Sequence, residues 1–200
     1  AKQIYYLQYS NNGEKLDLEA DPYIKLYNEY FGGGMNAIVF QEMREARGLA
    51  YSAAGRLLEP EYKDDNYKYF ALIATHNDKM QTAIEAFDEI INDMPVSETA
   101  FNIAKEALTT KYRTERITGR NILRSYQNAR DMGITEPRSK KIYEKLPELT
   151  LEDVKNTQEK WVKDRTYCYG ILGDIKNLDT DYLKTLGQVE ILTLEDIFGY

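Results

Sequence analysis

Residues 31–52 of this chain read FGGGMNAIVFQEMREARGLAYS, and they contain a turn, a helix and the start of a strand in close succession. Gly32, Gly33 and Gly34 are typical of a tight turn that ends one helix and lets the next one meet it. Apolar residues then recur at helical spacing. This spacing predicts a helix from Met35 to Ala46 whose apolar stripe consists of Met35, Ile38, Val39, Met43 and Ala46.

The junction after this helix places two polar side chains close together in sequence. Arg47-Gly48 ends the helix, and Leu49 to Leu58 has the composition of a strand. Arg44 falls opposite the apolar stripe, so we expect it to face away from the local core. Tyr51 comes near the beginning of the strand. The sequence therefore predicts a helix-to-strand junction between Arg44 and Tyr51.

The segments before this stretch predict one strand and one helix. Gln3 to Ser10 reads as a strand whose two faces are both apolar, as in a central strand or one with an aromatic outer face. Asp21-Pro22 predicts the start of a helix that runs to Phe31, with Asp21 as the N-cap and Pro22 at the first helical position.

The segments after it predict helices and three further strands. Tyr67 to Thr75 reads as a strand, and Asn77 as the cap of a helix with apolar residues at Met80, Ala83, Ile84, Phe87, Ile90, Ile91 and Met94. Pro95 ends that helix, and Ser97 is expected to cap the next one. Thr150 begins a capping box. The remaining expected elements are a short helix at Lys140–Lys145 and strands at Thr166–Gly173 and Val189–Leu192.

Strands and helices are segregated along the chain rather than alternating, which indicates an α+β fold. We expect an antiparallel or mixed sheet of about five to six strands, with helices packed mainly on one face. No linker is long or polar enough to divide residues 1–200, so a single domain is the economical interpretation. The chain begins inside a strand pattern and shows no signal peptide, so we expect a fragment of a longer protein, and the sequence indicates no compartment.

Composition narrows the range of functions. Of the 200 residues, 42% are hydrophobic and 30% charged, as in a globular domain with a core, and the net charge is −7. Because no basic stripe is visible, nucleic acid is not an expected partner. No apolar run approaches the length of a membrane span.

Metal and thiol chemistry have few candidates. His76 is the only histidine, whereas a catalytic zinc needs about three ligands from His, Cys and carboxylates. Since H-x-x-E-H and H-E-x-x-H are both absent, we expect no metal site here and interpret His76 as a capping or strand-edge residue. Cys168 lies in a strand pattern between two tyrosines, and we expect a small buried thiol.

The 31–52 segment resembles the one shared by domains of the insulinase/pitrilysin family of zinc peptidases, which includes the mitochondrial processing peptidases. The shared features are the glycine turn, a helix ending in a hydrophobic residue and Arg, and Gly48-Leu49-Ala50-Tyr51 leading into a strand; Met43 stands where Leu is usual. The Thr150 helix start and a closing strand that ends in Gly173-Asp174 extend the resemblance over nearly the whole chain.

The resemblance implies a half-shell domain that pairs with similar domains around an enclosed chamber. One kind of domain carries the H-x-x-E-H zinc motif, and another kind lacks it and contacts the peptide substrate. This chain resembles the second kind. It would bind no cofactor itself, and zinc is expected in a homologous partner domain, either fused or separate.

The resemblance also implies two site residues, because in domains of this kind an Arg and a Tyr seven residues apart reach the scissile peptide. Those positions are Arg44 and Tyr51. A phenol hydroxyl can donate to the oxyanion that forms when zinc-activated water attacks a carbonyl, and an Arg can hold a carbonyl or carboxylate with two parallel donors. Gly32, Gly33 and Gly34 are weaker candidates for lining the chamber.

Other interpretations stay open. Arg44 could simply lie on the solvated face of an amphipathic helix, and Tyr51 could be one of 17 tyrosines that pack the sheet. The first functional hypothesis is the non-catalytic, substrate-binding half of a zinc metalloendopeptidase. The second is a catalytically inert scaffold or interaction domain of the same fold, and the third is an unrelated α+β binding module.

Overall fold

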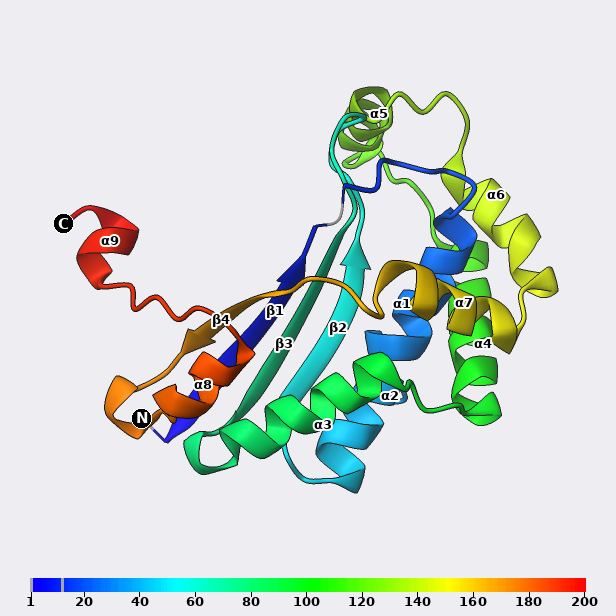
Figure 1. The fold of residues 1–200 in the computed structure, drawn as a ribbon. Coiled ribbons are helices and arrows are strands. Elements are labelled where there is room, and N and C mark those ends of the chain that lie inside the picture. Colours follow the sequence, from blue (N-terminus) through cyan, green and yellow to red (C-terminus); the bar gives the residue numbers. More distant parts are fainter. Residues whose placement is uncertain (1, 12) are drawn as a thin grey trace.

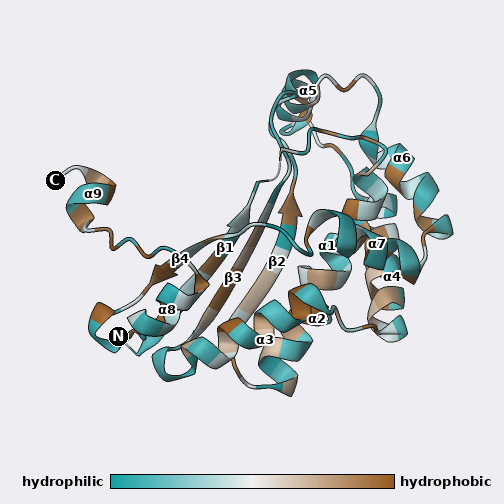
Figure 2. Cartoon of the chain, in the orientation of Figure 1, coloured by the Kyte–Doolittle hydropathy of each residue, from teal (hydrophilic) through white to brown (hydrophobic). Residues whose placement is uncertain are grey.

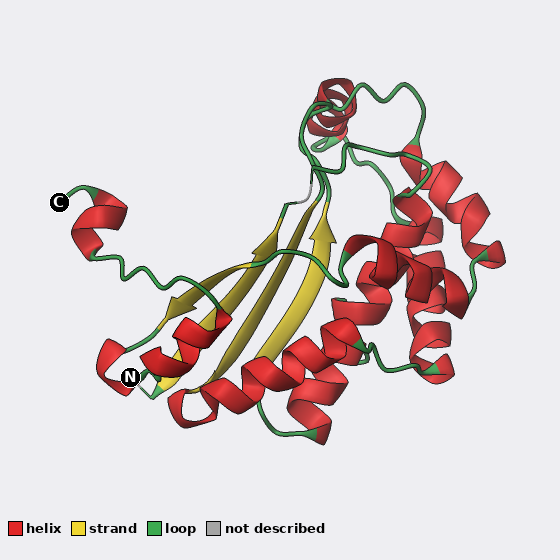
Figure 3. Ribbon diagram, viewed as in Figure 1, coloured by secondary structure: helices red, strands yellow, loops and turns green. Residues whose placement is uncertain are grey.

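The computed structural model describes residues 2–11 and 13–200, and within them one antiparallel sheet is covered by helices on one face (Figures 1 and 3). The strands lie in the order β2-β3-β1-β4. They are β1 (Gln3–Ser10), β2 (Ser52–Leu58), β3 (Lys68–His76) and β4 (Cys168–Leu172).

The helices follow the segregated order that the sequence predicts. They are α1 (Asp21–Gly32), α2 (Ile38–Phe40), the π-helical turn η1 (Gln41–Ala46), α3 (Met80–Asn92), α4 (Glu98–Thr114), α5 (Ile122–Asp131), α6 (Arg138–Lys145), α7 (Leu151–Trp161), α8 (Thr180–Leu186) and α9 (Leu194–Phe198). Short 3-10 turns occur at Asn77–Lys79, Leu146–Glu148 and Ile175–Asn177. None of the helices in the described residues combines the length and apolar character that a membrane span requires.

The two faces of the sheet differ in burial because successive side chains of a strand point to opposite sides. In β1, Ile4, Tyr6 and Gln8 are buried beneath the helices, whereas Tyr5 and Tyr9 are exposed. The register continues this alternation across the sheet, since Tyr6 pairs with Ile73 of β3 and with Ile171 of β4. Both expected features of this strand are therefore present: a central position and an aromatic outer face.

The expected five to six strands are wrong, because the sheet of the described residues has four. Val189–Leu192 has the composition of a strand but forms no ladder, and its apolar side chains are exposed. A strand needs a neighbouring edge to pair with, and none lies beside this segment. The same region holds α8 and α9, two short helices that the sequence pattern did not predict.

Helix starts were predicted partly correctly. Ser97 accepts a hydrogen bond from the Ala100 amide, and the Thr150 capping box is complete. The expected cap at Asn77 is wrong, since a 3-10 turn precedes α3. The expected cap at Asp21 is also wrong, because Asp21 is the first helical residue and its carboxylate binds elsewhere.

Cys168 and His76 lie at exposed positions. The expectation of a buried thiol is wrong, because β4 is an edge strand and its register places Cys168 opposite Tyr9 on the open face of the sheet. His76 is the last residue of β3, where its side chain makes no capping hydrogen bond, in keeping with a strand-edge residue.

A nearly buried ion pair connects the first helix to the distant α6. Asp21 is 2% exposed, and both of its carboxylate oxygens accept hydrogen bonds of 2.7 Å from the Arg138 guanidinium. Arg138 also lies 3.2 Å from Glu59, which pairs in turn with Lys25. Burial disfavours the charged form of Glu59, but Lys25 and Arg138 outweigh burial and lower its pKa. Breaking such a network leaves an uncompensated carboxylate inside the protein.

We expect Arg138→Met to lower the free energy of unfolding by about 2–4 kcal/mol, because Asp21 would lose the one cation with which it pairs among the described residues while it stays buried. Urea denaturation measures the change. Lys140→Met is the matched control: its ion pair with Glu144 is exposed at 3.9 Å, so its effect should stay within about 0.5 kcal/mol. Equal effects of the two substitutions would contradict the role given to Arg138.

A second polar group inside the fold is a half-buried carboxylate that forms no ion pair within the described part of the chain. Asp88 of α3 lies above the covered face of the sheet, where Gln8 donates a hydrogen bond to it at 3.3 Å. Tyr6, Tyr69, Tyr169 and Tyr182 interact with it electrostatically from β1, β3, β4 and α8. Its own helix also carries the acidic side chains of Glu85 and Glu89. Burial raises the pKa of Asp88 to about 6 although the Gln8 hydrogen bond opposes this.

The raised pKa predicts a pH-dependent stability. The folded state holds the Asp88 proton more tightly than the unfolded state, whose carboxyl pKa is near 3.8, so stability should fall as pH rises from about 4 through 6. Allowing for solvent screening, we expect a loss of about 1 kcal/mol that wild type shows and Asp88→Asn lacks. Asp93→Asn serves as an exposed control, and identical pH profiles for wild type and Asp88→Asn would refute the assignment.

Candidate functional site

The helix of the 31–52 segment is shorter and less regular than its sequence pattern predicts. It begins at Ile38 and changes after Phe40 into the π-helical turn η1. Ile38, Val39 and Met43 are buried as expected, whereas Met35 precedes the helix and is exposed. The backbone amide of Arg47 donates to the Glu42 carbonyl, five residues earlier. Such π turns are frequent at functional sites.

The chain that leads out of this turn is held by contacts from several elements. The guanidinium of Arg47 donates to Glu89 of α3 at 2.7 Å, and Lys79 donates to the Gly48 carbonyl at 3.0 Å. Thr75 of β3 donates to the Leu49 carbonyl at 2.6 Å. The Tyr51 amide then donates to Ala74 at 2.8 Å, which joins the segment to the sheet. The backbone around Tyr51 is therefore fixed although its side chain is exposed.

Arg44 and Tyr51, which the sequence placed on either side of the junction, come together in space. The Arg44 guanidinium carbon lies 5.5 Å from the centre of the Tyr51 ring and 5.1 Å from that of Phe40. Arg44 thus lies over two aromatic rings, contacts that orient the guanidinium and leave N–H groups at its edge. Phe40 was not expected to take part; its position four residues before Arg44 on a helix was the available signal.

The polar ends of this pair are available to a ligand. Tyr51 is 72% exposed, and among the described residues its hydroxyl makes no hydrogen bond. Arg44 has only a loose contact of 3.6 Å to the exposed carboxylate of Glu45. The arrangement therefore presents a phenol donor and a guanidinium side by side on a fixed backbone, and both can donate to carbonyl or carboxylate oxygens.

The three glycines have separate roles in the fold. A Cβ on Gly32 would lie 2.0 Å from the Gly55 carbonyl oxygen of β2, so the end of α1 touches this strand through backbone alone. This contact differs from the expected meeting of two helices. A Cβ on Gly55 would in turn lie 2.9 Å from Phe31 and from the Tyr69 hydroxyl. Gly33 and Gly34 are exposed, and a Cβ on Gly34 would meet no atom within 4 Å.

We expect Gly32→Ala to destabilise the chain by about 3 kcal/mol or more, since the new methyl group would force α1 away from β2. Gly34→Ala is the matched control two residues away and should change the free energy of unfolding by less than about 1 kcal/mol, in the stabilising direction. Chemical denaturation of both variants provides the comparison. A neutral Gly32→Ala would show that the helix and the strand are not packed as described.

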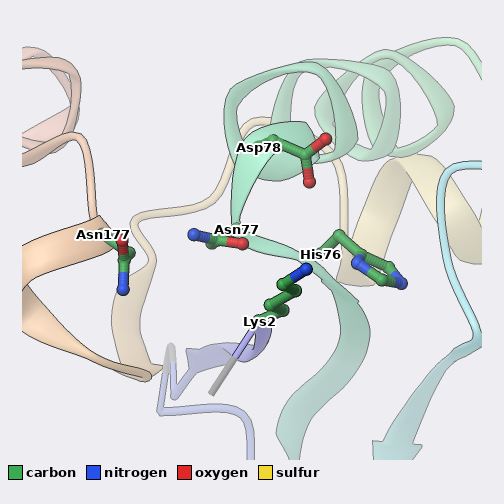
Figure 4. Close-up of a pocket in the computed structure, with 5 residues that line it drawn as sticks. All are labelled: Lys2, His76, Asn77, Asp78 and Asn177. Carbon is green, nitrogen blue, oxygen red and sulfur yellow. The ribbon is translucent and has the colours of Figure 1, made fainter.

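His76 lines a shallow pocket at the end of β1 and β3, together with Lys2, Asn77, Asp78 and Asn177 (Figure 4). The pocket has a volume of about 570 Å³. Among the residues that line it, Asp78 is the one carboxylate. Figure 4 shows the His76 ring directed away from Lys2 and Asn177. Over residues 2–11 and 13–200, no group of three or more His, Cys, Asp or Glu side chains could hold a metal ion. The residues present therefore do not fit a catalytic zinc.

The open face of the sheet is a further surface that sequence reasoning only partly anticipated. Tyr5 and Tyr9 of β1 and Leu172 of β4 are exposed on this face. Phe70 and Leu72 point to the same face from β3, the strand between β1 and β2. The alternation in β1 was the signal for the tyrosines. The contribution of Leu172 depends on the β1–β4 pairing, which the sequence does not specify.

These features define an α+β domain that has the helix-to-strand junction and, in the part of the chain that the structure describes, no set of zinc ligands. A family model described as the peptidase M16 inactive domain matches residues 3–108. The chain therefore belongs to the M16 peptidase family as an inactive domain. No curated protein sequence matches it.

Solved structures support the fold assignment. The chain is similar to a peptidase M16 inactive domain from Pseudomonas fluorescens, with 18% identity, a TM-score of 0.67 and coverage of 86% of this chain and 40% of that one. An inactive peptidase domain from Bordetella parapertussis gives 10% identity and a TM-score of 0.68, covering 86% and 92%. A chain of complex III2 from Candida albicans is similar as well, with 12% identity and a TM-score of 0.63. The match covers 93% of this chain and 46% of that one. The chain thus spans less than half of the first of these structures.

Proposed function

We propose that this chain is the non-catalytic, substrate-binding half of a zinc metalloendopeptidase. In this proposal a homologous domain with the zinc motif, fused or separate, completes the enzyme and a peptide binds between the two. The observation that carries the proposal is the Arg44–Tyr51 pair, which is exposed and stacked, and whose connecting segment is held by three hydrogen bonds to its backbone and by the Arg47–Glu89 ion pair. A solvated helix face would not require that support.

The chemistry proposed for this chain is positioning and charge stabilisation. The partner's zinc would supply the activated water. The Tyr51 hydroxyl would donate to the peptide oxygen as negative charge develops on it, and its fixed backbone would reduce the reorganisation required. The Arg44 guanidinium would hold a neighbouring carbonyl or carboxylate of the peptide with parallel N–H donors. Gly33 and Gly34, exposed beside the site, would line the chamber, whereas Gly32 is occupied by its contact with Gly55.

A second candidate is a catalytically inert scaffold domain of the same fold. The likeness to complex III2 from Candida albicans favours it, since that assembly contains a domain of this shape. The two candidates differ in what accompanies the chain in its source cell. A native species of at least twice 23.2 kDa that contains zinc supports the peptidase half. A zinc-free species supports the scaffold.

In the assembled enzyme, we expect Tyr51→Phe to lower kcat by about 10²–10³ while KM changes by less than about threefold, because the hydroxyl acts mainly in the transition state. Arg44→Ala should lower kcat and raise KM together, since it removes both a peptide contact and the ring stacking. Steady-state hydrolysis of a peptide measures these constants.

Tyr62→Phe is the control for Tyr51→Phe, because Tyr62 is also an exposed tyrosine but lies in the β2–β3 connection. Arg44→Lys separates charge from geometry: it keeps the charge and should not restore wild-type KM. An unchanged kcat in Tyr51→Phe would remove Tyr51 from the mechanism. An Arg44→Ala variant with wild-type constants would return Arg44 to the solvated helix face.

A further inference from the structure

A basic segment projects beyond one end of the sheet. Residues 111–130 run from the last turn of α4 through most of α5 and carry six basic side chains and one carboxylate, Glu115, although the whole chain has a net charge of −7. Every residue from 113 to 124 is exposed. The segment also exposes large apolar side chains at Ile117, Ile122, Leu123 and Tyr126. We call residues 111–130 the basic arm.

The arginines of the basic arm have little to neutralise them. Arg130 contacts the neighbouring Asp131 at 3.5 Å, and Arg116 donates to the backbone carbonyls of Arg113 and Glu115. Within residues 2–11 and 13–200, no ion pair is formed by Arg113, Arg120 or Arg124. An uncompensated basic surface interleaved with apolar side chains is a recognition surface for a partner that is acidic and apolar at once.

The last part of the chain has that complementary character. Residues 187–200 contain three carboxylates, Glu190, Glu195 and Asp196, and no basic side chain. Their apolar side chains are all exposed, namely Val189, Ile191, Leu192, Leu194, Ile197, Phe198 and Tyr200. We call residues 187–200 the acidic tail. It leaves the domain after α8 and stands away from the sheet, with apolar residues along its length (Figures 1 and 2).

The helix in the acidic tail is encoded locally but packs on no other element of the described residues. Thr193 and Asp196 form a complete capping box at the start of α9, and none of the five helical residues is buried. Helices this short are marginal in water without a packing surface. Leu194, Ile197 and Phe198 share one face through their three- and four-residue spacing. The tail therefore has a preformed apolar face that none of the described residues covers.

We propose that the acidic tail of one copy of this chain docks on the basic arm of a second copy. Within one chain the two segments lie far apart, with α9 beyond β4 and α5 beyond the opposite end of β2 (Figure 1). In a two-fold dimer each copy would both give a tail and receive one, so the contact would be made twice. This inference is independent of the Arg44–Tyr51 pair and of the proposed peptidase role.

Charge favours a second copy over a lipid surface. An anionic membrane would attract the basic arm but repel the carboxylates of the acidic tail, and it would leave the exposed tail unexplained. A second copy satisfies both segments with the same contact. Ion pairs between the arm and the tail would mainly determine which partner binds, whereas burial of the tail's apolar side chains would supply most of the affinity.

Sedimentation velocity of the full chain over a wide concentration range tests the proposal. We expect a reversible dimer that weakens at high ionic strength. The double reversals Arg116→Glu/Arg120→Glu in the arm and Glu190→Lys/Glu195→Lys in the tail should each weaken self-association at least about tenfold. The first leaves the arm with four basic and three acidic side chains, and the second leaves the tail with two basic and one acidic, so each removes most of the charge complementarity. These tail substitutions spare the Thr193–Asp196 capping box. The matched control, Lys140→Glu/Lys176→Glu, reverses two exposed lysines elsewhere and should leave the dimer unchanged.

Mixing the two reversed variants provides the decisive comparison. The two glutamates introduced into the arm of one variant face the two lysines introduced into the tail of the other, and the unaltered arm and tail face each other. The mixture should therefore form a heterodimer although neither variant dimerises alone. Loss of the dimer in both variants without recovery on mixing would overturn the proposal. A wild-type chain that stays monomeric at every concentration, or a dimer indifferent to both reversals, would also overturn it.

Discussion

The contact on which the rest of the structure depends is the backbone approach of α1 to β2 at Gly32 and Gly55. No side chain fits between them, because a Cβ on either residue would collide with atoms of the other element. The contact fixes the end of α1 over the sheet, and the glycine turn then delivers the chain into the helix at Ile38–Ala46. From there the π turn and its anchors set the Arg44–Tyr51 pair at the start of β2. The position of the candidate site therefore depends on the packing of α1 against β2.

Local patterns predicted most of the elements because their causes are local. The apolar stripe of α3 and the caps at Ser97 and Thr150 need only neighbouring residues to form. The errors lie where distant residues intervene. Asp21 does not cap its helix because Arg138, far along the chain, takes its carboxylate. Val189–Leu192 is not a strand because no sheet edge reaches it, and Cys168 is exposed because β4 ends the sheet.

The candidate site was predictable in part. The identity of Arg44 and Tyr51 came from the resemblance of the 31–52 segment to a known family, and helical spacing alone placed Arg44 on the outer side of its helix. Neither indicated that Arg44 lies over two aromatic rings, or that Arg47, Lys79 and Thr75 hold the intervening segment. Those contacts join residues that are far apart in sequence, so no periodicity reveals them. They distinguish a supported site from an ordinary exposed tyrosine.

Photo-crosslinking at position 51 tests the central claim most directly. A photoreactive phenylalanine analogue would replace Tyr51 in the protein that contains this chain and its zinc-bearing partner, with a peptide bound. Our account predicts crosslinks from position 51 to the peptide and to the partner's zinc-motif helix, and none from the same analogue at Tyr62. Absence of both crosslinks at position 51, or equal crosslinking from the two positions, would contradict the claim that this exposed pair faces substrate.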